Sequence, residues 1–170
     1  YYSVAVTVYN GIISIPRSIN TLLLGETTSK EPRQASALTA KATRSIVAAM
    51  GMVAITLSSL GPWLIPFMYG ADFSRAVIPV IFLLLSALLV GTSSAIQTYF
   101  ASINRPGLSS IINLTVVTAA LCTAPVLIII AGINGMAIAV LSARAVGLTL
   151  SLLWFRRLTD IPIASAILFT

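Results

Sequence analysis

The sequence contains no histidine, one cysteine and only four acidic residues among its 170 positions. A disulfide needs a second cysteine and a zinc site needs several cysteine or histidine ligands, so the chain on its own forms neither. Cys122 lies in an apolar run and is expected to be a small packing residue. Histidine and carboxylates are the usual general acids and bases. We therefore expect no catalysis, no metal site and no cofactor.

Charged residues are also scarce, at 8% of the chain, whereas soluble proteins carry about 25%. So few charges cannot cover a water-facing surface, and 58% of the residues are hydrophobic. A net charge of +6 favours nucleic-acid binding in a soluble protein. Here the basic residues lie in short gaps between long apolar runs, a pattern typical of membrane loops. We predict an all-α polytopic membrane protein with no nucleic-acid partner.

Five stretches are long enough to cross a bilayer, because about 20 helical residues span a hydrocarbon core of roughly 30 Å. Residues 108–143 contain no charge over 36 positions, which is too long for one span, and the turn-forming residues 132–135 divide them. The predicted spans are 3–24, 46–68, 78–102, 108–130 and 134–155. Residues 161–170 form a tail or begin a sixth span. Since the sequence starts without Met and stops in an apolar run, we expect residues 1–170 to be part of a longer chain.

The gaps between the predicted spans differ in charge. Those at 25–45, 103–107 and 156–160 hold seven basic residues, whereas 69–77 and 131–134 hold only one. The positive-inside rule places the first set in the cytoplasm and Tyr1 on the outer side. We expect residues 25–45 to form a solvated basic loop that only fixes the topology. The alternative is a helix with Pro32 in its first turn, which extends the second span into the cytoplasm.

Two arginines fall inside predicted spans. Arg144 lies ten residues from both Asn134 and Trp154, near the bilayer midplane, where an arginine costs about 2.5–3.5 kcal/mol on insertion scales. Arg17 lies about 12 Å from the cytoplasmic boundary at helical rise, within partial snorkelling reach. The four acidic residues all lie in predicted loops. The counter-charge is therefore either a bound anion or a carboxylate from another part of the full chain.

Polar residues spaced three and four apart form a stripe on the first span, and such a stripe cannot comfortably face lipid. Its members are Ser3, Thr7, Asn10, Ser14, Arg17 and Thr21, whereas Ser18 and Asn20 fall off it. Weaker stripes on the third and fifth spans comprise Ser86, Ser93, Gln97 and Asn104, and Arg144, Gly147 and Ser151. They predict a wet cavity whose binding residues are Arg17, Arg144, Asn10, Ser14 and Gln97. Alternatively, the small residues are helix-packing seams.

Four segments carry a family resemblance: residues 1–5 (YYSVA), 66–76 (PFMYGADFSRA), 101–107 (ASINRPG) and 132–137 (GINGMA). In order and spacing they resemble bacterial polysaccharide (Wzx-type) flippases of the multidrug/oligosaccharidyl-lipid/polysaccharide transporter superfamily. The resemblance implies a two-lobe transporter of the bacterial cytoplasmic membrane, of which this chain covers part of one six-helix lobe. It implies movement of undecaprenyl-diphosphate-linked oligosaccharide by alternating access, for O-antigen, capsule or exopolysaccharide synthesis. Arg17 and Arg144 would then meet the lipid diphosphate.

Three other functions remain open from the residues alone. A drug/cation antiporter of the same superfamily ordinarily needs an intramembrane carboxylate. A membrane enzyme of glycan assembly needs catalytic residues and usually a sizeable outer loop. A purely structural membrane subunit predicts that neutralising Arg17 and Arg144 leaves export intact. On the flippase hypothesis, the expected partners are the lipid-linked oligosaccharide, membrane lipids and the remaining half of the chain.

Overall fold

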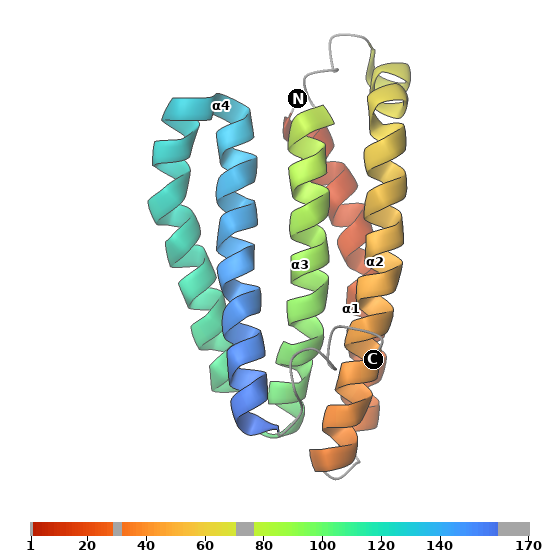
Figure 1. Ribbon diagram of the computed structural model, residues 1–170, viewed down its shortest axis with the longest axis vertical. Coiled ribbons are helices and arrows are strands. Elements are labelled where there is room, and N and C mark those ends of the chain that lie inside the picture. Colours follow the sequence, from red (N-terminus) through yellow and green to blue (C-terminus); the bar gives the residue numbers. More distant parts are fainter. Residues whose placement is uncertain (1, 29–31, 71–76, 160–170) are drawn as a thin grey trace.

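The computed structural model describes residues 2–28, 32–70 and 77–159. These residues form helices joined by short connections (Figure 1). The elements are α1 (Tyr2–Thr28), α2 (Pro32–Tyr69), α3 (Val77–Ser102) and α4 (Pro106–Leu158). Gly132 divides α4, because its backbone is non-helical (φ 56°, ψ −132°), and Figure 1 shows the two halves turning back on each other as a helical hairpin. Glycine adopts this positive φ without a Cβ penalty.

Four helical segments are long and apolar enough to cross a membrane: Gln34–Trp63, Val77–Ser102, Pro106–Gly132 and Asn134–Leu158. The protein is therefore an all-α, multi-pass membrane protein. The predicted third span, 78–102, coincides with α3 almost to the residue. The division of the long apolar stretch is also confirmed, with its turn at Gly132.

The first two spans depart from the prediction. Residues 3–24 are helical within α1, but α1 is not among the four candidate spans, because its polar stripe and Arg17 lower its hydropathy. The helix α2 begins at Pro32 rather than near residue 46, so the solvated loop expected at 25–45 is wrong and the helical extension is confirmed. Glu26 belongs to α1, not to a loop. The predictions for residues 71–76 and 161–170 lie outside the described residues.

The centre of the bundle is α3, which packs against α1, α2 and α4. One buried cluster joins α1, α2 and α3 through residues that include Ile13, Ile46 and Leu84. The other joins α2, α3 and α4, and it includes Ala35, Ala40, Ile96, Tyr99, Phe100, Ile112 and Phe155. Two small residues of the α2 extension thus belong to the core, which explains why this segment is a packed helix.

Two glycines permit close helix contacts. A Cβ at Gly91 of α3 would lie 3.1 Å from Ile46 Cγ2 and 3.5 Å from Pro16 Cβ, so this position holds α1 and α2 close to α3. Gly147 has the same role within the α4 hairpin, where the Val116 side chain occupies the space of the missing Cβ. The contact at Pro16 fixes the neighbouring Arg17 beside α3.

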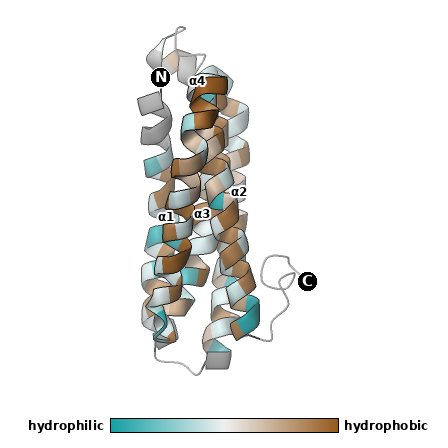
Figure 2. Cartoon of the chain, turned by 90° about the vertical axis from the view of Figure 1, so that its left-hand side faces the viewer, coloured by the Kyte–Doolittle hydropathy of each residue, from teal (hydrophilic) through white to brown (hydrophobic). Residues whose placement is uncertain are grey.

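The outward surface is largely apolar. Exposed side chains include Ile55, Trp63 and Phe67 on α2 and Leu114 and Leu121 on α4. Figure 2 shows hydrophobic colours over much of the bundle, with hydrophilic segments recurring along α1. Such an apolar surface suits contact with lipid. Cys122 is exposed on the first half of α4, so its predicted role as a packing residue is wrong.

Candidate functional site

Arg17 and Arg144, which are far apart in the sequence, line one pocket between α1, α3 and α4. The pocket has a volume of about 250 Å³. Its other lining residues are Tyr9, Asn10, Ile13, Pro16, Asn20, Val90 and Ser94. Three of the five predicted binding residues, Asn10, Arg17 and Arg144, therefore come together in space.

The position of Arg17 follows from how α1 packs. Ile12, Ile13 and Pro16 are buried, whereas Asn10 and Arg17, two helical turns apart, are exposed. The helix continues to Thr28, so Arg17 lies about 16 Å from its end at helical rise. That is deeper than the sequence estimate, which placed the boundary near Gly25. Arg17 is therefore well inside the length of its helix.

Arg144 lies in the middle part of the second half of α4 and is half-buried. None of the described side chains is acidic. Among these described residues, neither the Arg17 nor the Arg144 guanidinium group has a hydrogen bond or an ion pair. Two like charges at one pocket repel each other. Since guanidinium groups are donors only, the pocket favours an anion.

Asn20 was not predicted and connects two elements of the site. Its Nδ2 atom donates a hydrogen bond of 2.8 Å to Ser94 Oγ, which ties α1 to α3. Asn20 is one helical turn beyond Arg17 and therefore lies near the same side of α1. The spacing of three residues from Arg17 is the signal that could have identified Asn20. The predicted stripe passes from Arg17 to Thr21, four residues on, and so leaves Asn20 out.

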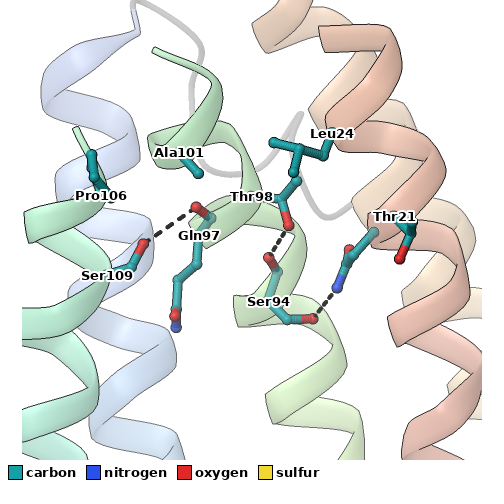
Figure 3. A pocket seen from close by; sticks show the side chains of 9 residues that line it. Thr21, Leu24, Ser94, Gln97, Thr98, Ala101, Pro106 and Ser109 are labelled. Atoms are coloured by element: carbon teal, nitrogen blue, oxygen red, sulfur yellow. Dashed lines mark hydrogen bonds between the residues drawn. The ribbon is translucent and has the colours of Figure 1, made fainter. Parts of the chain in front are cut away.

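Gln97 lies in a second pocket, of about 460 Å³ (Figure 3). This pocket is lined by Asn20, Thr21, Leu24, Ser94, Gln97, Thr98, Ala101, Pro106 and Ser109. Gln97 Oε1 accepts a hydrogen bond of 3.2 Å from Asn113 Nδ2 of α4. Because Asn20 and Ser94 line both pockets, the two adjoin. The lining residues of the second pocket are all uncharged.

Four stripe residues, Ser14, Ser86, Ser93 and Ser151, line neither of these two pockets. Ser14 is exposed, and its hydroxyl donates to the carbonyl of Gly11 at 2.6 Å. Ser86 and Ser93 are buried, and each donates to a carbonyl of its own helix. Ser151 is also buried and donates to the carbonyl of Gly147. The packing-seam interpretation is therefore correct for these buried residues. The stripe residues that do line a pocket are divided between the two adjoining pockets, with Asn10, Arg17 and Arg144 in the first and Thr21 and Gln97 in the second.

Searches of protein-family models, of curated proteins and of solved structures find no match for this chain. Its function is therefore inferred from its residues and their geometry. That geometry is a cationic pocket and an adjoining uncharged pocket within an apolar, multi-pass helical bundle.

Proposed function

We propose that this protein is part of a flippase for a lipid-linked oligosaccharide, and that Arg17 and Arg144 bind the diphosphate of the lipid. The observation that carries the proposal is that two arginines from helices far apart in the sequence line one pocket. An arginine at membrane depth costs about 2.5–3.5 kcal/mol on insertion scales. A bound anion compensates both arginines at once.

The chemistry of the pocket supports a phosphate group. Each guanidinium presents a planar fork of N–H donors that matches phosphate oxygens, and charge-assisted hydrogen bonds are about twice as strong as neutral ones. The attraction is stronger in a poorly solvated cavity than in water. A diphosphate offers enough oxygen atoms for both arginines. Asn10, which lines the same pocket, supplies a further amide donor.

The specific substrate comes from the family resemblance. Undecaprenyl-diphosphate-linked oligosaccharide, the bacterial cytoplasmic membrane and alternating access are what a Wzx-type flippase implies. The charge distribution supports the orientation, because Arg105 lies where α3 meets α4, and Arg156 and Arg157 lie in the last turn of α4, at the same end of the bundle (Figure 1). By the positive-inside rule this end is cytoplasmic. The activity we propose is transport without catalysis.

The test replaces each arginine with glutamine in the full-length protein and measures surface glycan in a complementation assay, with membrane abundance recorded alongside. We expect Arg17→Gln and Arg144→Gln each to lower export about tenfold or more, because each loses charged hydrogen bonds to the diphosphate. Arg156→Gln is the matched control, since Arg156 is exposed at the end of α4 and lines neither pocket. Normal glycan at normal abundance in both pocket variants would contradict the proposal.

A further inference from the structure

The second pocket is lined by hydroxyl groups that already donate their hydrogens to backbone carbonyls. Thr21 Oγ1 donates to the Arg17 carbonyl at 3.0 Å. Thr98 Oγ1 donates to the Ser94 carbonyl at 3.0 Å, and Ser109 Oγ donates to the Gln97 carbonyl at 3.3 Å (Figure 3). A hydroxyl has one hydrogen and two lone pairs. These oxygen atoms therefore offer hydrogen-bond acceptors to the pocket.

The same reasoning fixes the Asn20 amide at the boundary between the pockets. Ser94 Oγ donates to the Gly91 carbonyl at 2.8 Å, so it can only accept from Asn20. The amide nitrogen must therefore face Ser94. The Asn20 Oδ1 atom is left as a buried acceptor with no hydrogen-bond partner among the described residues. The Gln97 Nε2 group is the exception, because it remains a donor beside these acceptors.

The two adjoining pockets thus have opposite hydrogen-bonding character. The pocket with Arg17 and Arg144 presents charged donors, whereas the second presents mainly neutral acceptors. A phosphate diester anion has no hydrogen to donate, so it suits the first pocket and not the second. The volume of the second pocket, about 460 Å³, lies within the range of about 300–1,000 Å³ typical of small-molecule sites.

We infer that the second pocket binds the hydroxylated, uncharged part of the same ligand. Hydroxyl groups of the ligand donate to the oxygen atoms of Thr21, Thr98 and Ser109, while its anionic group lies between the two arginines. Leu24 and Ala101 provide apolar contacts for the C–H groups of a sugar ring. The inference rests on the proposed function and specifies how the first sugar is recognised. An ammonium group also seeks acceptors, but the charges of two neighbouring arginines disfavour it.

The test compares two probes on the purified full-length protein, farnesyl diphosphate and its glucosyl derivative. Thr21→Val and Thr98→Val remove one acceptor oxygen each and preserve the side-chain shape. We expect each to weaken binding of the glucosyl probe about three- to tenfold, the effect of one lost hydrogen bond, and to leave farnesyl diphosphate binding unchanged. Thr118→Val is the control, because Thr118 is exposed and donates to the Leu114 carbonyl outside both pockets.

The outcomes separate this inference from the proposed function. Arg17→Gln weakens both probes if the proposed function is correct. The inference is overturned if the two pocket threonine variants bind the glucosyl probe as the wild type does, or if they weaken both probes equally. It is also overturned if hexylammonium binds more tightly than the glucosyl probe and loses its affinity in the same variants. If the wild type binds neither diphosphate probe, the proposed function fails and the inference fails with it.

Discussion

Replacing Gly91 with alanine tests the contact that holds α1 and α2 against α3. The new methyl group would lie 3.1 Å from Ile46 Cγ2 and 3.5 Å from Pro16 Cβ, whereas carbon atoms prefer about 3.5–4.0 Å. Ile46 is completely buried and Pro16 is part of a helix, so neither can move aside freely. Overpacking of this kind costs about 1–3 kcal/mol. Removing a helical glycine returns about 0.5–1 kcal/mol, which leaves a net destabilisation of about 1 kcal/mol.

A second substitution relieves the crowding. Ile46→Leu moves the branch from Cβ to Cγ and removes the Cγ2 atom that the new methyl group meets. We expect the double variant, Gly91→Ala with Ile46→Leu, to recover most of the stability that Gly91→Ala loses. The control is Gly51→Ala on α2, where a Cβ meets no atom within 4 Å. That variant should be as stable as the wild type or slightly more so.

The assay is equilibrium unfolding of the full-length protein in mixed micelles, followed by helical circular dichroism. A double-mutant cycle between positions 91 and 46 then gives the coupling free energy. The packing argument is refuted if Gly91→Ala matches Gly51→Ala in stability. It is also refuted if the coupling between the two positions is zero, because the clash would then not involve Ile46.

One further substitution and one thiol reagent test other parts of the structure. Gly135→Ala should abolish accumulation of the membrane-inserted protein, because its Cβ would overlap the carbonyl of Leu127 in the α4 hairpin. The control is Gly107→Ala, whose Cβ meets no atom within 4 Å. Equal immunoblot signals from the two variants would contradict the hairpin geometry. Cys122, exposed beside the exposed Leu121, should resist a charged, impermeant thiol reagent in intact membranes, because the apolar lipid around this face excludes a charged reagent. Rapid labelling before detergent unfolding would place this face in water.

The sequence predicts α3 and the α4 hairpin well because their signals are strong and local. A long apolar run has to be a buried or lipid-facing helix, and the glycines at 132 and 135 mark the reversal. The start of α2 was missed because Lys41 and Arg44 suggested a loop. The stronger signal was the run of small residues Ala35, Thr39 and Thr43, spaced four apart, all of which are buried.

The candidate site was predictable only in part. Arg17 and Arg144 are anomalous in apolar segments, so the sequence identifies them without a structure. That they share a pocket depends on α1 and α4 both packing against α3, which no local pattern contains. The same dependence separates Gln97 from the arginine pocket. Asn20 was missed because a stripe describes one face of one helix, whereas a pocket wall involves neighbouring turns of several.

Packing and binding are linked on α3 through residues one turn apart. Gly91 permits the close contact with Pro16, and Ser94 donates to the Gly91 carbonyl, accepts from Asn20 and lines both pockets. A shift of α1 relative to α3 therefore changes the packing at Gly91 and the walls of both pockets together. For the transport function that we propose, this linkage lets one helix displacement weaken the binding of the anion and of the hydroxylated group at the same time.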